Sequence, residues 1–244
     1  MKKIGIIGGI GWPSTIEYYK LIQQLWQTHF GDYLDFDLPE ICIESINMRK
    51  ALRLRGDNTP GSWEQWEAYV IEAIKNLELA QCDIIAMASV TPHSRLPQLQ
   101  ASTKLPILSV YDSVTRACKL HDIHKCLILG TLPTMTTPAF KSAMEEAGIE
   151  AWYPHEERAI QNTLRVIEKL YANNQEGTKE ALCQIVSEVL GEHENRNTAV
   201  ALGCTELSTA FPEHINETVF HYNGITFLNV FVAHVEDIVT TSLK

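Results

Sequence analysis

The chain has 244 residues, 45% hydrophobic and 20% charged, which is the composition of a globular protein with one large or two smaller domains. Its formal net charge of −10 argues against a nucleic-acid or membrane partner, because the overall field repels phosphate groups. Residues 1–3 lead straight into an apolar stretch of about four residues, far shorter than a signal-peptide core or a membrane span. We therefore expect a cytoplasmic location.

The cysteines show no disulfide or metal-binding pattern, because none of them stands in a Cys-x-x-Cys motif. Cys204 is the unusual one, since Gly203 and Thr205 beside it mark the end of a strand. His193 lies in a densely charged stretch without a second histidine at helical spacing, so we expect a solvated helix end and no metal site. The remaining thiols are expected to be reduced and inert: Cys42, Cys82, Cys118, Cys126 and Cys183.

Short apolar strands alternate with amphipathic helices along the chain. Helices are expected over 14–27, after Ser62 with Gln65 at the capping-box position, and over 230–243. The strands are expected at 4–7, 41–43, 84–87, 107–110, 126–129 and 200–202. This alternation predicts an α/β fold with largely parallel strands.

The same order of strand, small polar loop and helix recurs in two similar parts of the chain. The turn at 104–106 and the strand after it are a plausible boundary. We therefore expect two similar Rossmann-like lobes with mostly parallel sheets. The first lobe would comprise residues 1–110, completed by the C-terminal helix at about 226–244, and the second would comprise residues 111–225.

Two of the expected strands end in a small nucleophilic residue that is soon followed by a threonine. The strand at 84–87 leads into Ser89 and Thr91, and the strand at 200–202 leads into Cys204 and Thr205. Ligands of open parallel sheets bind beyond the carboxyl ends of the strands, so both segments predict a site. The two segments differ in chemistry, because one carries a thiol and the other only a hydroxyl.

Three further features allow alternative interpretations. The glycine-rich start, 5–11, lacks two parts of a dinucleotide fingerprint: the glycine that would replace Ile6, and an acidic residue about 20 residues later. We therefore expect a strand-to-helix turn for a small ligand and no nucleotide cofactor. His93 could be either a base or a residue of a helix N-terminus. Arg49 follows a strand closely enough to reach the same site, although arginines there are ordinarily a surface cluster.

The motifs together resemble the aspartate/glutamate racemase superfamily, most closely its aspartate racemase branch. The opening IGIIGGIGWPSTIEYY at 4–19 is similar to IGxIGGMxWxSTxxYY, and SVTPH at 89–93 stands where the family carries C/S/T-N-T-x-H. GTLPTM at 130–135 resembles GTxxTM, and GCTE at 203–206 is the family's own tetrapeptide. The closing strand and helix at 227–234 are also similar. The resemblance spans nearly the whole chain.

This resemblance implies two lobes with the active site in the cleft between them, and cofactor-independent racemisation of acidic amino acids. In the family one cysteine thiolate removes the α-proton and the opposite thiol delivers a proton to the other face. The catalytic residues would be Cys204 and Ser89, with a helix N-terminus and nearby donors keeping the thiolate available near neutral pH. The implied substrate-binding residues are Trp12, Arg49, Thr91, Thr131, Thr134, Arg158 and Thr205. Of the two arginines, the resemblance favours Arg158 to hold the side-chain carboxylate, and Arg49 is a weaker candidate. Relatives also imply a homodimer.

The chain departs from the family pattern at three positions. Ser89 replaces the usual cysteine and Val90 the usual asparagine, while Asn229 stands where aspartate is frequent. An ordinary serine hydroxyl is a far weaker acid and base than a thiol, so racemisation by two equal groups is not expected. Because the second-lobe thiol serves the L-enantiomer in the family, we expect a preference for L-aspartate or L-glutamate. The alternatives are a one-cysteine isomerase or decarboxylase, or a silent protein that binds an acidic ligand.

Overall fold

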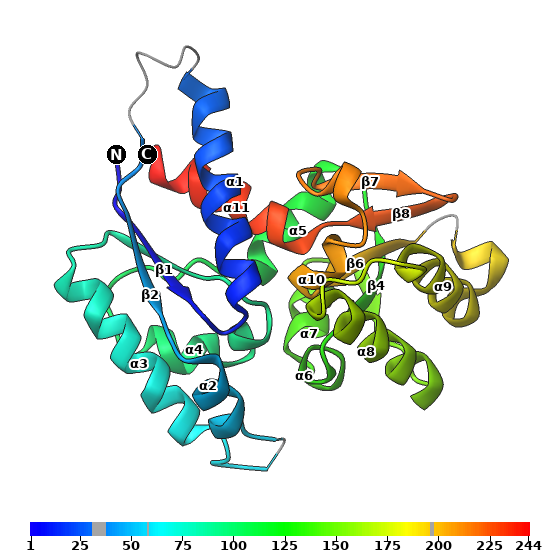
Figure 1. Cartoon of the computed structure of the whole chain (residues 1–244), viewed down its shortest axis with the longest axis horizontal. Helices are drawn as coiled ribbons and strands as arrows, with labels where there is room; N and C mark the ends of the chain where they lie inside the picture. The colour runs from blue at the N-terminus through cyan, green and yellow to red at the C-terminus, as the bar shows by residue number, and fades with distance from the viewer. Residues whose placement is uncertain (31–37, 58, 196–197) are drawn as a thin grey trace. The chain divides into compact units, whose positions relative to one another are not determined.

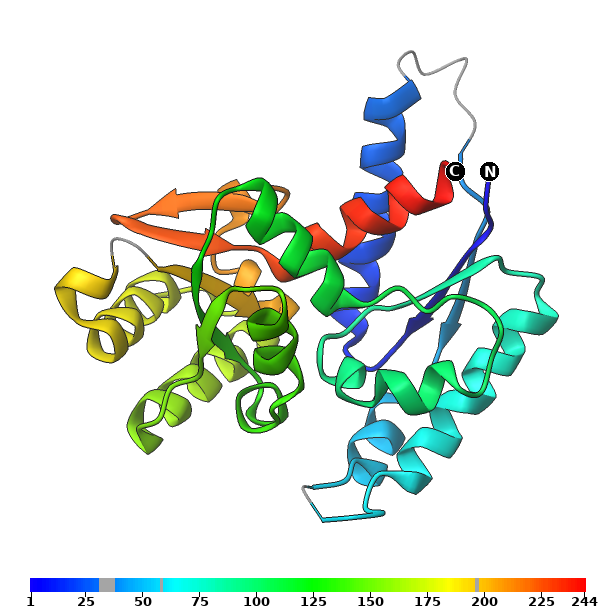
Figure 2. The same ribbon diagram turned by 180° about the vertical axis from the view of Figure 1, so that it is seen from behind.

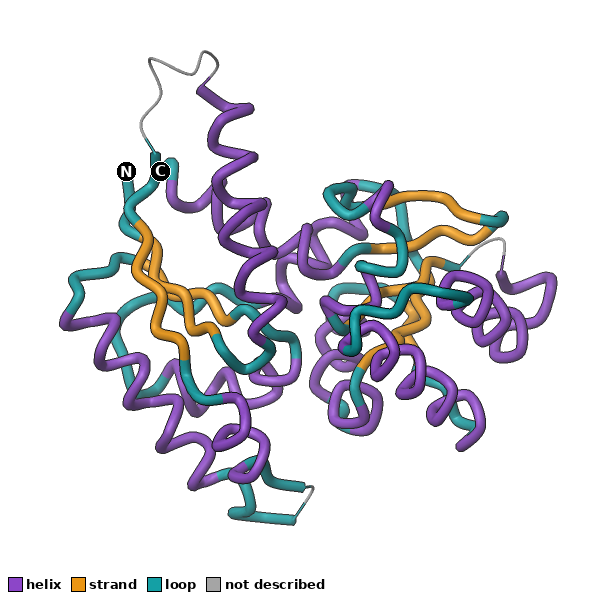
Figure 3. Tube along the Cα trace, in the orientation of Figure 1, coloured by secondary structure: helices purple, strands orange, loops and turns teal. Residues whose placement is uncertain are grey.

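The computed structural model describes residues 1–30, 38–57, 59–195 and 198–244, and for 192–195 it describes the backbone alone. The chain divides into two compact units: unit 1 comprises 1–109 with 234–244, and unit 2 comprises 110–233. Each unit has a sheet of its own, drawn in orange in Figure 3. Among the described residues, no helix is long and apolar enough to cross a membrane.

Unit 1 has a parallel sheet in the order β2-β1-β3. Ile7, Ile85 and Met87 on one face of this sheet share a buried apolar cluster with Trp66 and Val70 of α3. Helix α1 lies on the opposite side of the sheet from α3 (Figure 1). The elements of the N-terminal segment are β1 (Ile4–Gly8), α1 (Trp12–Phe30), β2 (Ile41–Ser45), α2 (Met48–Leu54), α3 (Glu64–Leu79), β3 (Ile84–Met87), the 3₁₀-helix η1 (Thr91–Arg95) and α4 (Leu96–Gln100).

Unit 2 has a five-stranded sheet in the order β5-β4-β6-β8-β7, parallel except for the hairpin of β7 and β8. Its elements are α5 (Val110–Leu120), β4 (Lys125–Gly130), α6 (Leu132–Thr136), α7 (Ala139–Glu146), β5 (Glu150–Trp152), α8 (Glu157–Tyr171), α9 (Thr178–Asn195), β6 (Ala199–Gly203), α10 (Thr205–Ser208), the 3₁₀-helix η2 (Pro212–His214), β7 (Val219–Tyr222) and β8 (Ile225–Leu228). Helix α11 (Val230–Ser242) begins in unit 2 and continues in unit 1.

The core of unit 2 follows from the apolar runs of its central strands. β6 is buried along its whole length, and Val200 and Leu202 share one cluster with Val166 of α8 and Val186 of α9. The view from behind shows α5 on the other side of this sheet (Figure 2). The central strands are thus covered on both faces, which explains why they consist of nearly continuous hydrophobic residues.

Three details differ from the expectations from sequence. Ile107 forms only an isolated bridge with Ile85, and Val110 already begins α5, so the strand at 107–110 is not formed. The Ser62 hydroxyl donates to the Asp57 carbonyl, and α3 begins at Glu64 without a side-chain cap. The chain returns to unit 1 at residue 234 and not near 226, because β8 pairs with β6 in the second sheet.

Candidate active-site residues

The central strands of unit 2 end in a pair of glycines. Gly130 of β4 lies opposite Gly203 of β6 in the parallel register. A Cβ atom at Gly203 would lie 2.7 Å from the Leu129 carbonyl oxygen, so a side chain there would force the two strand ends apart. The Thr134 methyl group would lie 2.9 Å from a Cβ at Gly130 and 3.2 Å from one at Gly203. The glycines therefore bring the residues that follow β4 and β6 close together.

Cys204 follows this glycine pair and stands at the N-cap of the short helix α10, with extended backbone. Its thiol donates a hydrogen bond to the Glu206 carboxylate, with 2.8 Å between Sγ and Oε2. The exposed fraction is 6% for Cys204 and 4% for Glu206. A buried acid and a buried nucleophile are therefore in direct contact at the carboxyl end of β6. Glu206 was part of the GCTE motif in the sequence, but the sequence alone assigned it no role.

Burial raises the pKa of the Cys204 thiol well above its ordinary value, and the negative charge and hydrogen bond of Glu206 raise it further. The main-chain amide of Glu206 acts in the opposite direction but does not outweigh these effects. The expectation that a helix N-terminus keeps the thiolate available near neutral pH is therefore wrong for this structure. The resting group is a thiol, and forming the thiolate requires a proton acceptor.

Hydroxyl groups surround the same strand ends. Thr131 is the N-cap of α6, and its Oγ1 lies 3.1 Å from Oγ1 of the buried Thr134. Thr205 is the first residue of α10 and is 5% exposed. The structure therefore gathers the predicted residues Cys204, Thr131, Thr134 and Thr205 at one edge of the unit 2 sheet. These groups could donate to the carboxylate of a carbanion, as an oxyanion hole does.

Arg158 is placed differently from the other predicted residues of unit 2. It lies on the exposed side of α8, where its side chain is 72% exposed, and its Nη2 atom lies 3.4 Å from Glu188 of α9. An exposed ion pair of this kind contributes little to stability. A contact between Arg158 and a substrate carboxylate would have to compete with Glu188, and it stays a prediction.

In unit 1 the predicted residues follow three neighbouring parallel strands. Trp12 begins α1 after β1, Arg49 lies in the first turn of α2 after β2, and Ser89 and Thr91 follow β3. The turn after β1 requires glycine at position 9, where φ is +79° and a Cβ atom would lie 2.1 Å from a main-chain oxygen. All four predicted residues are therefore at the carboxyl edge of this sheet. Trp12 is 61% exposed.

Ser89 is partly exposed, whereas Val90 beside it is 4% exposed. Within the described part of the chain, no side chain forms a hydrogen bond with the Ser89 hydroxyl. Arg49 is exposed, and no carboxylate of the described residues pairs with it. At the carboxyl edge of the unit 1 sheet, the Ser89 hydroxyl therefore has no described side chain to activate it, and the Arg49 guanidinium is not paired with a described carboxylate.

His93 is not a base for Ser89. It lies in η1, its Nδ1 atom is 3.0 Å from the Ser89 main-chain oxygen, and its Nε2 atom is 3.3 Å from the Leu108 oxygen. Burial lowers the pKa of His93 to about 4, although the carbonyl contacts oppose this shift. Of the two interpretations of His93, the structure supports the residue of a short helix.

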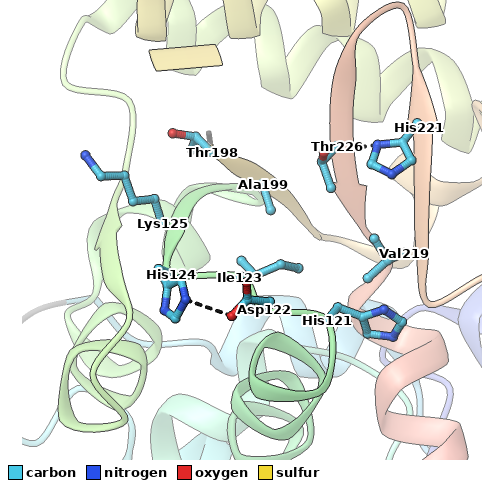
Figure 4. Close-up of a pocket in the computed structure, with 10 residues that line it drawn as sticks. All are labelled: His121, Asp122, Ile123, His124, Lys125, Thr198, Ala199, Val219, His221 and Thr226. Carbon is cyan, nitrogen blue, oxygen red and sulfur yellow. Dashed lines mark hydrogen bonds and ion pairs between the residues drawn. The ribbon is translucent and has the colours of Figure 1, made fainter. Parts of the chain in front are cut away.

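A cavity of about 550 Å³ lies in unit 2 away from these residues (Figure 4). Its lining residues Lys125 and Ala199 begin β4 and β6, so it opens at the amino ends of the strands, opposite Cys204. His124 there is paired with Asp122 at 2.9 Å. Across the residues that the structure describes, no group of three or more histidine, cysteine or acidic side chains could hold a metal ion, and the side chain of His193 lies outside them.

Comparison with known proteins agrees with this arrangement. The profile of the Asp/Glu/Hydantoin racemase family matches residues 7–238. The chain is 24% identical over 217 residues to the broad specificity amino-acid racemase RacX of Bacillus subtilis (strain 168), covering 88% of this chain and 90% of that protein.

Solved structures show the same fold over the full length. The crystal structure of an aspartate racemase homologue from Pyrococcus horikoshii OT3 has a TM-score of 0.80 and 29% identity, with 100% of both chains covered. A putative Asp/Glu racemase from Yersinia pestis has a TM-score of 0.82 and 23% identity, again over 100% of both chains. An aspartate racemase from Picrophilus torridus has a TM-score of 0.72 and 20% identity, covering 99% and 95%.

The protein is thus an amino-acid racemase in class, an isomerase with a two-unit α/β fold. It belongs to the Asp/Glu/Hydantoin racemase family. The family resemblance and the fold class predicted from the sequence are both confirmed.

Proposed function

We propose that this protein is a cofactor-independent racemase of acidic amino acids, aspartate or glutamate, that acts preferentially on the L-enantiomer. Cys204 would exchange the α-proton on one face of Cα, and Ser89 would act on the other face. The observation that carries the proposal is the buried contact between Cys204 and Glu206 at the carboxyl end of β6.

The contact supplies what the weakly acidic Cα–H bond requires. Glu206 accepts the thiol proton, so that a thiolate and a neutral carboxylic acid form without any change in total charge. Because the pKa of Cys204 is raised, its thiolate is a stronger base than an ordinary one. The thiolate takes the α-proton, and the electron pair of the C–H bond passes into the substrate carboxylate, where hydroxyl donors such as Thr131 and Thr205 would stabilise it.

The second half of the reaction is weaker. Ser89 delivers its hydroxyl proton to the opposite face of the carbanion and must then recover a proton from solvent, while Glu206 releases to solvent the proton that it took from Cys204. Val90 offers no polar side chain beside it. Return of a proton by Cys204 to the face it came from, called retention, should therefore be faster than inversion through Ser89. This asymmetry supports the preference for the L-enantiomer.

Recognition of the acidic side chain requires a cation. We propose Arg49 as the first candidate, because its guanidinium is exposed and unpaired with the described carboxylates, whereas Arg158 is engaged with Glu188. Arginine suits a carboxylate through its two parallel N–H donors. Trp12, at the start of α1, would be a further contact to the substrate. The homodimer and the cytoplasmic location stay predictions.

A one-cysteine isomerase or decarboxylase is the second candidate, and the observation that favours it is the unassisted Ser89 hydroxyl. The deciding experiment incubates the protein in D₂O with L- and D-aspartate and with L- and D-glutamate. Incorporation of α-deuterium with inversion supports the racemase. Incorporation with retention alone supports one-sided chemistry, and tight binding without incorporation supports a silent acidic-ligand-binding protein.

A further inference from the structure

The ring of His93 is enclosed by main-chain oxygens of its own unit. Nδ1 lies 3.0 Å from the Ser89 oxygen and 3.3 Å from the Val90 oxygen, and Nε2 lies 3.3 Å from the Leu108 oxygen. The side chain is 1% exposed. All three contacts are with acceptors, so a neutral ring, which carries one N–H, can donate on one side only.

A second buried histidine, His234, indicates which ring nitrogen of His93 carries the hydrogen. On one side of the His234 ring, Nε2 lies 3.1 Å from the Leu108 carbonyl oxygen, which can only accept a hydrogen bond. A neutral His234 therefore carries its proton on Nε2, and its Nδ1 accepts from the Tyr18 hydroxyl of α1 at 3.0 Å. Leu108 therefore already accepts a hydrogen bond from His234. The remaining donor, on His93, is best used at the Ser89 carbonyl, where the distance is shortest.

The network links the Ser89 segment to two helices that are distant in the sequence. The rings of His93 and His234 lie 5.3 Å apart between centroids in an edge-to-face arrangement. Helices α1 and α11, which carry Tyr18 and His234, cross each other in both views (Figures 1 and 2), and the Tyr18–His234 hydrogen bond joins them. The main chain at Ser89 is thus connected to Tyr18 and His234, which are both fully buried.

We infer that His93 is a positioning residue, whose Nδ1–H holds the Ser89 carbonyl and so sets the direction of the Ser89 hydroxyl for proton delivery. The inference rests on the proposed role of Ser89. Proton delivery requires a close and aligned donor, and a displacement of about 1 Å can reduce such a step by up to about 100-fold. His93 should therefore affect inversion through Ser89 and not retention through Cys204.

Two substitutions that replace the His93 ring with a side-chain amide distinguish the roles of its two nitrogens. In His93→Asn the side-chain N–H lies near the position of Nδ1, whereas in His93→Gln it lies near the position of Nε2. With L-aspartate in D₂O, we expect His93→Gln to lower the ratio of inversion to retention about ten-fold. We expect His93→Asn to keep the ratio within about two-fold of wild type. Equal ratios in wild type and both variants would overturn the inference.

A readout independent of activity is hydrogen–deuterium exchange of the amides at 88–93. We expect faster exchange in His93→Gln than in wild type or His93→Asn, and equal rates in all three would also overturn the inference. The matched control is His234→Gln, because His234 is equally buried and contacts Leu108 but not Ser89. His234→Gln should lower the free energy of unfolding without changing the ratio of inversion to retention. If wild type shows no inversion, the proposed two-sided function fails, and amide exchange alone decides the positioning by His93.

Discussion

The thiol of Cys204 and the carboxylate of Glu206 form a buried hydrogen bond, with Sγ 2.8 Å from Oε2, directly after the glycine that ends β6. This contact makes the cysteine hard to ionise and at the same time provides the acceptor for its proton. A catalytic thiol is more often activated by a cation that lowers its pKa. Here the carboxylate would activate it by taking the proton without changing the total charge.

Replacement of Cys204 tests the principal acid/base. Cys204→Ala is expected to abolish α-deuterium incorporation while leaving the fold and the binding of acidic ligands largely intact, because only one small side chain is lost. Mass spectrometry of L-aspartate recovered from D₂O measures the exchange. Cys183→Ala is the matched control, since Cys183 lies in the same buried cluster and should keep its exchange activity. Retained exchange in Cys204→Ala would exclude this cysteine as the base.

Glu206→Gln should separate the acidity of the thiol from its catalytic use. Removing the carboxylate charge lowers the pKa of Cys204, so alkylation of Cys204 by iodoacetamide should begin at lower pH than in wild type. Exchange at Cα should nevertheless fall by about 100-fold, because the proton acceptor is lost. Peptide mass spectrometry assigns the alkylated cysteine. An unchanged alkylation profile together with unchanged exchange would show that Glu206 has no part in the reaction.

The two arginines should differ in their effect on acidic substrates. Arg49→Ala is expected to raise KM for aspartate at least about ten-fold, because a charge-assisted hydrogen bond is lost, and to leave binding of alanine nearly unchanged. Arg158→Ala should have a smaller effect, since Arg158 is exposed and paired with Glu188. Steady-state kinetics with both amino acids measures this. A larger selective loss in Arg158→Ala would reverse the assignment.

A thiol at position 89 should restore the missing partner. Ser89→Cys, and more strongly the double variant Ser89→Cys with Val90→Asn, is expected to raise turnover of the D-enantiomer more than that of the L-enantiomer. The reason is that a thiol, with a pKa near about 8.5, is a far better acid and base than a hydroxyl. Kinetics and deuterium incorporation with both enantiomers of aspartate and glutamate test this. No gain on the D-side in either variant would favour the one-cysteine alternative.

The stability of unit 1 should depend on pH through His93. Burial lowers its pKa to about 4 in the folded state, whereas an unfolded histidine titrates near about 6.5. The unfolded state therefore binds the proton first, and the stabilisation, complete above about pH 6.5, is lost as the pH falls towards about 4, by about 3 kcal/mol. His93→Asn lacks this dependence, so its free energy of unfolding should approach that of wild type at low pH.

Urea denaturation followed by tryptophan fluorescence can measure this difference, because Trp12, Trp26, Trp63 and Trp66 all lie in unit 1 and only Trp152 lies in unit 2. A constant difference between wild type and His93→Asn from pH 7 to pH 4 would contradict a buried neutral ring.

The sequence by itself determined the features that depend on local patterns. The alternation of apolar strands and helices specified an α/β chain with Ser89 and Cys204 just beyond strand ends, and the structure has both there. The GCTE motif and the opening of the chain indicated the family, and the family profile matches residues 7–238. These conclusions rest on neighbouring residues alone, and no packing partner was needed to reach them.

Only the tertiary structure decided which polar groups face one another. The hydrogen bond of Cys204 to Glu206 depends on both side chains being buried, and Cys204 shares its apolar cluster with Val166 of α8. The contacts of the His93 ring depend on Leu108 and on His234, which is 141 positions further along the chain. Ile16 shows the same limit, because it is an apolar residue of the helix expected over 14–27 and yet is 53% exposed. Periodicity fixes the angle of a side chain around its helix, but only packing determines what that side chain meets.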